Sequence, residues 1–588
     1  MTYQAPIRDI LFNIESLSSW SQVCALPRYD DIDAGDARAA LEEFGRFCGD
    51  VIAPLTREGD EAGAKFNGET VELPSSFATA YSQFVDMGWQ SLAHPPEFGG
   101  MGLPHAVGAA ATEILNAADM SFGLCPLLTN GAIDALLVCG SEDQKNQYLE
   151  NLITGKWTGT MNLTEPQAGS DLGRVRTKAT PADDGSYAIS GTKIFITYGE
   201  HELSENIIHL VLARTPDAPA GPKGLSLFIV PKFLLDENGA PGTRNGVNCV
   251  SVEHKLGVKA SPTAILDYDK AKGFLIGEEN KGLSYMFVMM TAARFAVGVQ
   301  GVAISERAYQ HALRYANERV QSRPVDGSAK DAVAIIEHPD VRRMLMQMRA
   351  FTEGGRALSL ATAGWLDLAH NGAEDQRADA DAMAEFLVPL VKGWCTERAL
   401  EVTSLGVQIH GGMGFIEETG VAQLYRDARI LPIYEGTTAI QANDLLGRKI
   451  LRDGGKTASR FAAMIKATED DLRALGDTEI AIADALTNAR RDFDDCLAFI
   501  LETAPTDPNA VFAGGVPFLM MVGNLAVGWQ MGRAVLAAKA AIADDIDTPF
   551  MTQKIATASY FAHHVLVESP SLRARVKNGA TSLLAATF

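Results

Sequence analysis

A change of texture in the middle of the chain is the feature that most constrains its fold. Between Trp157 and about Ile276 the residues form short, β-branched, alternating runs such as YAISGTKIFIT and GLSLFIVPKF. The pair Asp184-Gly185 is typical of a hairpin turn between such runs. On both sides of this stretch, apolar residues recur at helical spacing instead. The pattern predicts a β domain flanked by helical domains.

The segment before the β domain shows several amphipathic helices. ARAALEEFGRFCGDVIAPL, FATAYSQFVDMGWQSL and AVGAAATEILNAAD all carry a 3.6-residue apolar period. Ser141 with Asp143 marks the start of a further helix, SEDQKNQYLENLITG. The Pro- and Gly-rich stretch His94 to Pro104 is predicted to be a rigid loop.

Helices return after the β domain. One long amphipathic segment, from LSYMFV to NERV, precedes helical patterns over Pro339 to Asn371 and Ala378 to His410. Helices of this length usually pack as a bundle. A glycine break near Gly454 separates a last, Ala-rich helical block, Thr457 to Phe588.

We therefore expect a multidomain α+β fold, since 588 residues exceed what one core can hold. The expected parts are an N-terminal extension (1–34), an N-terminal helical domain (35–157), a middle β-barrel-like domain (158–277), a C-terminal four-helix-type domain (278–452) and an additional C-terminal helical domain (453–588). Such an order of domains does not by itself specify a function.

Composition restricts the class of partner. Lys and Arg number 51 against 73 Asp and Glu, and the net charge of -22 repels nucleic acid and anionic lipid. The most apolar window, Val516 to Ala541, contains Asn524, Gln530 and Arg533, so it reads as a packed helix rather than a membrane span. We expect neither a nucleic-acid nor a membrane partner.

The cysteines and the first residues point to a cytoplasmic protein. The seven cysteines are scattered and include no C-x-x-C pair, which argues against a disulfide framework or a zinc site. The start MTYQAPIRDILFNIESL lacks the basic residues and apolar run of a signal peptide. Reduced thiols, no metal and a cytoplasmic location are the expectation.

Standard nucleotide motifs are missing, but one glycine-containing segment is a candidate for a ligand. There is no P-loop, and GMGFIE from Gly412 has Glu417 where a dinucleotide fingerprint needs its third glycine. The segment MNLTEPQAGSDLG, Met161 to Gly173, offers backbone N–H groups and the hydroxyls of Thr164 and Ser170. From composition alone, an ordinary β-turn loop is the simpler interpretation.

A lone carboxylate, Glu435, stands between an apolar run and a Gly-Thr-Thr turn in RILPIYEGTTAIQAN. One interpretation is a helix start, because acidic residues favour an N-terminal turn and threonines cap well. The other is a catalytic base whose pKa is raised by its apolar surroundings. The residues of this stretch alone leave both open.

Four motifs in order, TEPQAGSDLG, GTKIFIT, QIHGGMGF and YRDARILPIYEGTTAIQ, resemble the acyl-CoA dehydrogenase family from about Ala37 to Arg448. The extension, the helical tail and GEHELSENIIHLVLARTPDAP are most similar to the larger-subunit branch that includes 3-methylmercaptopropionyl-CoA dehydrogenases. The resemblance implies FAD-dependent oxidation of an acyl-CoA to its trans-2-enoyl product, with a base taking the α-proton and a hydride passing to the flavin.

The resemblance implies a role for Glu435 as that base, because it stands where the family keeps the carboxylate. Some relatives carry the base on the first long helix of the bundle, one residue before an arginine. This chain has Ala293 there, before Arg294, so only Glu435 matches. The α C–H of a thioester is a weak acid, so such a site must also stabilise enolate charge with fixed hydrogen-bond donors.

The remaining site residues are likewise carried over from the resemblance. It implies contacts to FAD and to acyl-CoA, with Phe195 standing where many relatives have tryptophan. The FAD contacts are Met161, Leu163, Thr164, Ser170, Phe195, Ile196, Thr197, Thr437 and Thr438, and, from a partner subunit, Arg319, Gln408, His410, Gly411 and Gly412. The substrate contacts are Ser170, Arg294, Tyr434 and Gly436. His410, His563 and His564 have packing or surface positions as the alternative to any ligand role.

The implied partners are an acyl-CoA, an electron-transferring flavoprotein and a second copy of the chain, in a homodimer or a dimer of dimers. A short thioether acyl group is the implied substrate, with straight short or medium chains as rivals. Two other functions share the fold: an acyl-CoA oxidase, and a flavin-containing DNA-binding protein of the alkylation-response type. The latter needs a basic surface, which a net charge of -22 disfavours.

Overall fold

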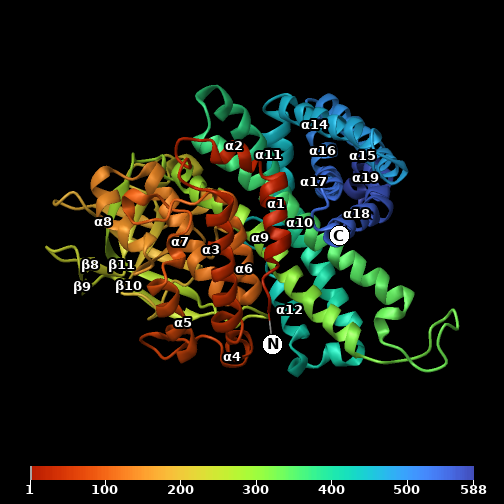
Figure 1. Cartoon of the computed structure of the whole chain (residues 1–588). Coiled ribbons are helices and arrows are strands. Elements are labelled where there is room, and N and C mark those ends of the chain that lie inside the picture. Colours follow the sequence, from red (N-terminus) through yellow and green to blue (C-terminus); the bar gives the residue numbers. More distant parts are fainter. Residues whose placement is uncertain (1–2) are drawn as a thin grey trace. The chain divides into compact units, whose positions relative to one another are not determined.

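The computed structural model describes residues 3–588, which cluster into two compact units. The mixed unit holds Glu43–Leu103 and Ile114–Ala296, with Tyr3 and Gln4. The helical unit holds Ala5–Glu42, Pro104–Glu113 and Val297–Phe588. Figure 1 follows the chain through its elements. The expected class is confirmed: helices, then a sheet, then helices again. The two units divide the chain differently from the five expected domains, whose boundaries stay predictions.

Helices precede the sheet, as the apolar periodicity predicts. They are α4 (Leu55–Ala62), α5 (Ser75–Asp86), α7 (Met120–Cys139) and α8 (Glu142–Ile153), together with α3 (Ala34–Phe47) and α6 (His105–Ala118), which have residues in both units. Helix α9 (Gly282–Glu318), which follows the sheet, also has residues in both units. Ser141 caps α8 and Asp143 lies in its first turn, as expected, and Gln144 completes a capping box with Ser141. Helix α5 ends earlier than its apolar pattern because Gly88 takes a left-handed conformation with φ 74°.

The middle of the chain forms a seven-stranded sheet. Its strands are β3 (Trp157–Asn162), β4 (Lys178–Pro181), β5 (Tyr187–Thr197), β6 (Asn206–Ala213), β7 (Ser226–Pro231), β10 (Val247–Val252) and β11 (Thr263–Ile276), in the order β3-β6-β7-β11-β5-β4 with β10 on β11. Only β3 and β6 are parallel. The predicted hairpin joins β4 to β5, and Gly185 adopts φ 81° in its turn. Two small ribbons pair β1 (Lys65–Phe66) with β2 (Val71–Glu72) and β8 (Phe233–Leu235) with β9 (Pro241–Arg244).

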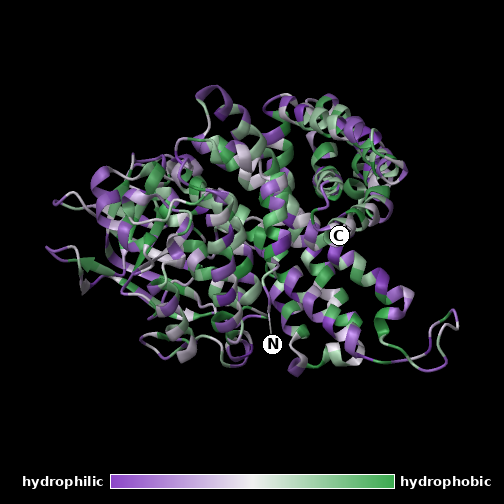
Figure 2. Ribbon diagram, in the orientation of Figure 1, coloured by the Kyte–Doolittle hydropathy of each residue, from purple (hydrophilic) through white to green (hydrophobic). Residues whose placement is uncertain are grey.

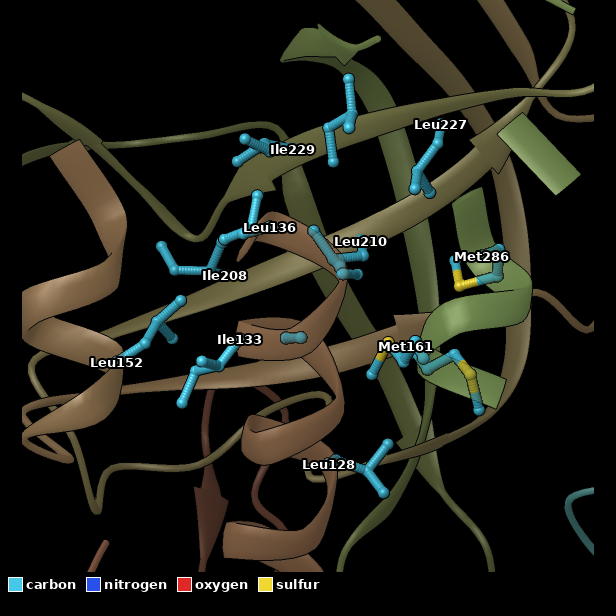
Figure 3. Close-up of a cluster of buried hydrophobic side chains, with 14 of the residues drawn as sticks. Leu128, Ile133, Leu136, Leu152, Met161, Ile208, Leu210, Leu227, Ile229 and Met286 are labelled. Carbon is cyan, nitrogen blue, oxygen red and sulfur yellow. The ribbon is translucent and has the colours of Figure 1, made fainter. Parts of the chain in front are cut away.

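The two faces of the sheet bury different cores, so a strand such as β6 is buried along its whole length and departs from the expected alternation. Leu210 of β6 joins Leu136 of α7 and Met286 of α9 in one cluster, shown in Figure 3. The next residue, Val211, faces a second cluster with Phe228 and Val230 of β7. Successive side chains of a strand point to opposite faces, so β6 is buried on both. The start of α9 is thereby fixed against the sheet.

Two helices, α7 and α9, are long and apolar enough to cross a membrane when judged by length and composition alone. The apolar stretches of both are mostly buried inside the protein, 72% for α7 and 61% for α9. Core helices of soluble proteins pass the same test. The window that the sequence singled out, Val516 to Ala541, lies in α17 and is not one of the two.

The helical unit is built on three long helices. They are α10 (Pro339–Asn371), α11 (Glu374–His410) and α17 (Gly515–Ala543), and the other helices are α1 (Ile7–Leu17), α2 (Trp20–Cys24), α12 (Val421–Ala428), α13 (Thr438–Asp444), α14 (Lys456–Arg473), α15 (Asp477–Thr503), α16 (Pro508–Ala513), α18 (Thr548–His564), α19 (Ser569–Asn578) and α20 (Ala580–Ala585). Hydrophilic and hydrophobic residues alternate along them (Figure 2). The expected break falls at Gly454 and Gly455, which have φ 67° and 80°.

Helix α17 of the added block packs directly on the bundle helices α10 and α11. Close approach requires a glycine, because a Cβ at Gly523 would lie 2.4 Å from the ring of Trp394 on α11. The Trp394 indole N–H also donates to Asn524 Oδ1 over 2.8 Å. The added helices therefore share a core with the bundle and brace α11.

A buried ion cluster links five helices: α1, α6, α9, α10 and α18. Arg356 of α10, 1% exposed, donates to Asp9 Oδ2 at 2.6 Å, to Glu113 Oε1 at 2.5 Å and to Glu306 Oε2 at 2.6 Å. Lys554 of α18 donates to the other oxygen of Asp9 at 2.6 Å. Burial opposes the charge of Asp9, but Lys554 and Arg356 lower its pKa to about 2. Through Asp9, the N-terminal extension is thus linked both to Arg356 of the bundle and to Lys554 of the added block.

We expect Arg356→Met to lower the free energy of unfolding by about 3–5 kcal/mol, because three carboxylates would lose their buried partner. Arg343→Met is the matched control: Arg343 lies on the same helix but forms one exposed ion pair with Asp340, worth about 0–1 kcal/mol. Urea denaturation followed by circular dichroism measures both. Equal midpoints for the two variants would contradict the assigned role of the cluster.

Candidate active site

Glu435 sits in a backbone conformation that carboxylates rarely adopt. It lies in the connection between α12 and α13, and both Glu435 (φ 54°) and Gly436 (φ 94°) are left-handed. For a residue other than glycine this costs about 1–2 kcal/mol. Strain of this kind persists where the surroundings enforce it and clusters at functional sites. The side chain of Glu435 is half-buried.

The helix that follows has its own cap. Thr437 precedes the first residue of α13, and its Oγ1 accepts from the N–H of Ile440 at 3.3 Å. Glu435 lies two residues before that cap. Of the two interpretations of RILPIYEGTTAIQAN, helix capping therefore describes Thr437 and does not account for Glu435. The hydroxyl of Thr438 donates to Glu397 Oε1 at 2.5 Å, which anchors the first turn of α13 to α11.

Tyr434, an expected substrate contact, is held by the helix bundle. Its hydroxyl donates to Gln300 Oε1 of α9. Burial and the adjacent Glu435 carboxylate raise the pKa of the Tyr434 phenol far above its usual range, against a lowering effect of Gln300. Tyr434 is therefore neutral at physiological pH. Sequence reasoning missed Gln300, because a single glutamine on a long helix carries no signal.

Backbone carbonyls around Glu435 are held from two helices. Lys392 of α11 donates to Leu431 O at 2.9 Å and to Gly436 O at 2.7 Å. Gln441 of α13 adds longer contacts to Glu435 O and Gly436 O, at 3.4 and 3.3 Å. Sequence reasoning missed Lys392 as well. The sequence did contain a signal, because Lys392 is the only charged residue in the apolar run FLVPLVKGWC, which lies within an expected helix.

The residues expected to act on a partner subunit's cofactor gather where α9 and α11 end. Arg319 is exposed, and its Nη2 donates to Gln321 Oε1 at 3.2 Å. Gln408, Gly411 and Gly412 are exposed too. His410 differs: its ring stacks on Tyr315 with centroids 4.3 Å apart, and its Nδ1 is 2.7 Å from Gly406 O. The ring of His410 thus packs α11 on α9, as its alternative interpretation held.

In the mixed unit, the structure brings the two expected flavin motifs together. The segment after β3 meets β5, where the N–H of Ile194 donates to Thr164 O at 2.9 Å. Met161 and Ile196 are buried, Leu163, Thr164 and Thr197 are half-buried, and Ser170 is exposed. Phe195 adopts φ 61° and is 58% exposed. An aromatic ring is thus presented to solvent from a strand whose neighbouring residue, Ile196, is in the core.

A buried ion pair fixes these two motifs. Lys193 Nζ is 2.9 Å from Glu165 Oε1 and donates to Leu163 O at 3.1 Å. Glu165 also accepts from Thr177 Oγ1 at 2.6 Å and from the N–H of Arg176 at 2.7 Å. Burial raises the pKa of Glu165, but Lys193 and these hydrogen bonds outweigh it and lower the pKa to about 2. Burial lowers the pKa of Lys193 to about 8, which Glu165 opposes.

The donor set at this place suits the edge and face of a flavin ring. Backbone amides and the hydroxyls of Thr164, Ser170 and Thr197 can pair with its polar edge. The exposed ring of Phe195 can stack on a flat aromatic system, as the tryptophan that many relatives have at this position would. No group of three or more His, Cys, Asp or Glu among residues 3–588 is arranged to hold a metal ion.

Arg294 and Ala293 lie on the part of α9 that belongs to the mixed unit. The Arg294 side chain is buried, with its Cζ 6.0 Å from the ring centroid of Phe287. An arginine that packs helices together would be buried in the same way, so the burial is compatible with either that role or a substrate contact. Ala293, at the position where some relatives keep their base, is 2% exposed within the core.

Family models match nearly the whole chain. They are described as the N-terminal domain (residues 35–156), the middle domain (160–271) and the C-terminal domain (280–450) of acyl-CoA dehydrogenases, and as an acetyl-CoA dehydrogenase C-terminal-like domain (461–587). The last model covers most of the additional helical block.

Individual proteins are similar over the same extent. A 3-methylmercaptopropionyl-CoA dehydrogenase of Ruegeria pomeroyi is 68% identical, covering 100% of both chains. A broad-specificity linear acyl-CoA dehydrogenase of Mycobacterium tuberculosis is 38% identical, covering 96% of this chain and 95% of that one. The crystal structure of a Bacillus anthracis acyl-CoA dehydrogenase complexed with FAD superimposes with a TM-score of 0.76 at 23% identity, covering 96% and 90%.

Proposed function

The chain belongs to the acyl-CoA dehydrogenase family, and from this premise we propose that it oxidises a short acyl-CoA thioester to the trans-2-enoyl-CoA, with Glu435 as the base and FAD as cofactor. The main support is the left-handed conformation of Glu435, which helix capping does not explain because Thr437 caps the helix that follows. Electrons then pass to an electron-transferring flavoprotein.

The chemistry requires a carboxylate held in one place. The α-hydrogen of a thioester is weakly acidic, so its removal needs a base at hydrogen-bond reach and donors on the carbonyl oxygen, where charge develops. Glu435 takes the α-proton onto its carboxylate. Its backbone N–H, on a turn fixed by Lys392 and Gln441, is a donor of the kind the developing enolate needs. Tyr434 and Gly436 border the thioester.

FAD, when bound, supplies the acceptor for the hydride that leaves the β-carbon. The residues of this chain that would hold its ring are Met161, Leu163, Thr164, Ser170, Phe195, Ile196 and Thr197, with the Lys193 and Glu165 pair fixing the backbone behind them. Phe195 would stack on the ring and exclude water from one side. The family resemblance adds Thr437 and Thr438 as further candidate contacts.

The substrate we propose is 3-methylmercaptopropionyl-CoA. The support is the relative of that name, which is 68% identical over every residue of both chains. Another relative of similar length, a broad-specificity linear acyl-CoA dehydrogenase, is only 38% identical to this chain. A thioether chain is close in length to a short straight acyl group, so a related pocket suffices for it.

We further propose a cytoplasmic homodimer. Its support is the exposed Arg319, which carries a guanidinium suited to a pyrophosphate, beside the exposed backbone of Gly411 and Gly412. Hydrophobic side chains adjoin this region, among them Phe415 at 87% exposure. All seven cysteines are free thiols, which suits a reducing compartment.

The dimer proposal predicts that light scattering finds at least twice the mass of one chain. Arg319→Ala should keep that mass but release FAD on dilution, because one phosphate partner is gone. Arg323→Ala, on the same loop, serves as the control and should retain FAD. A monomer that holds FAD as firmly as the dimer would contradict the proposal.

Glu435→Gln should bind FAD and keep its yellow colour, yet lose turnover by several orders of magnitude, because an amide cannot accept the α-proton. Dye reduction by the best acyl-CoA measures turnover, and the absorption spectrum measures bound FAD. Retention of near-normal turnover would show that another group is the base.

Rates of ferrocenium reduction with 3-methylmercaptopropionyl-, butyryl- and octanoyl-CoA test the substrate. We expect the first to have the highest kcat/KM, by about tenfold or more, the size typical of a mismatch in an apolar pocket. After anaerobic bleaching, admission of air should restore the colour only slowly. A preference for octanoyl-CoA would refute the substrate, and rapid recovery with peroxide formation would favour an oxidase.

A further inference from the structure

Lys392 is a fully buried lysine whose side chain ends at the Glu435 turn. It is 0% exposed on α11, in the middle of the apolar run FLVPLVKGWC. Lysine is almost never fully buried, because an ammonium loses its hydration there. A buried ammonium at this place must therefore be compensated by what it contacts.

Its ammonium contacts include two carbonyl groups, one on either side of Glu435. Nζ donates to Leu431 O at 2.9 Å and to Gly436 O at 2.7 Å, which are normal charge-assisted hydrogen bonds. The two carbonyls lie at the beginning of the turn and directly after the base. One side chain thus fixes the backbone before and after Glu435 relative to α11.

The turn needs such support because its conformation is unfavourable on its own. Two consecutive left-handed residues, Glu435 and Gly436, take the backbone out of any helix, so their carbonyls accept from side chains instead of from helical N–H groups. Gln441 contacts the same region at 3.3 to 3.4 Å, near the long limit of a hydrogen bond. Lys392 therefore provides the shorter and charged restraint, and without it the turn can relax to an ordinary conformation.

The restraint is anchored in a stiff part of the helical unit. Two residues along α11, Trp394 is fully buried and donates to Asn524 of α17. At Gly393, a Cβ would meet Leu519 of α17 at 2.7 Å, so the two helices are in close contact beside Lys392. The position of the ammonium is thus set by the added helical block as well as by the bundle.

We propose that Lys392 is a positioning residue for proton transfer, holding Glu435 and its N–H in the geometry of reaction through Leu431 O and Gly436 O. The proposal rests on the proposed function of Glu435 as the base. Small errors of position are costly in catalysis: a shift of about 1 Å is worth about 10²-fold in rate. Removal of the ammonium should therefore reduce the rate of proton transfer more than it weakens binding.

The test uses the full-length, FAD-loaded enzyme with Lys392→Met, which keeps the length of the side chain and removes its donors. We expect kcat to fall about 10²-fold, with KM and the FAD content within about threefold of the original. The isotope effect of an α-deuterated acyl-CoA on flavin bleaching should increase, because proton transfer becomes more rate-limiting. Lys449→Met is the matched control; Lys449 pairs with Glu385 in the same unit and should leave all four quantities unchanged.

Unchanged kcat and isotope effect in Lys392→Met would overturn the proposal. So would a parallel loss of kcat, KM and FAD, which is the signature of a general structural role. If Lys392→Met does not fold, Lys392→Gln, which keeps a neutral NH₂ donor group but not the charge, takes its place with the same expected division between kcat and KM. Glu435→Gln, run alongside, separates the two claims: if it retains turnover, the base is wrong, whereas its loss with intact Lys392→Met kinetics refutes only the positioning role.

Discussion

The proposed base, Glu435, depends on a backbone conformation that neither helix nor strand provides. A left-handed Glu435 followed by a left-handed Gly436 directs the side chain out of a turn between α12 and α13. The conformation is held by Lys392, Gln441 and the capped start of α13. Lys392 lies on the long helix α11, and the short helix α13, which carries Gln441, is anchored to α11 through the hydrogen bond from Thr438 to Glu397. The position of the turn therefore depends on α11.

The added helices and the N-terminal extension belong to this stiffness. Arg356 gathers Asp9, Glu113 and Glu306 around one guanidinium, and Lys554 of the added block shares Asp9. Removing one member would leave buried charges unpaired, which is why such clusters fix relative position even where their net contribution to stability is small. On α11, Gly393, which follows Lys392, lies close to Leu519 of α17. The extra helices thus support the helix that holds the Glu435 turn.

Much of this could be read from the sequence, and the exceptions have physical reasons. Helix and strand periodicity gave the order of elements, and the Asp184-Gly185 turn and the break near Gly454 are where they were expected. Ser141 caps α8 and Asp143 lies in its first turn, as expected, whereas the reciprocal hydrogen bond of Gln144 depends on local geometry that the sequence did not single out. The grouping of Ala5–Glu42 with the C-terminal helices depends on contacts far apart in the sequence, which periodicity cannot encode.

For the candidate site, the motifs located Glu435, Phe195 and the segment after β3, but not the groups that orient them. Lys392 and Gln300 act through tertiary contacts alone. The ring of His410 packs on Tyr315, which a local pattern does not reveal. The central claim, that Glu435 removes the α-proton, is tested most directly with an acyl-CoA whose β-carbon carries no hydrogen, so that no hydride can leave. In D₂O the native enzyme should exchange the α-hydrogens of this thioester for deuterium, seen as a mass gain, and the Glu435→Gln enzyme should not. Equal exchange by both enzymes would contradict the account.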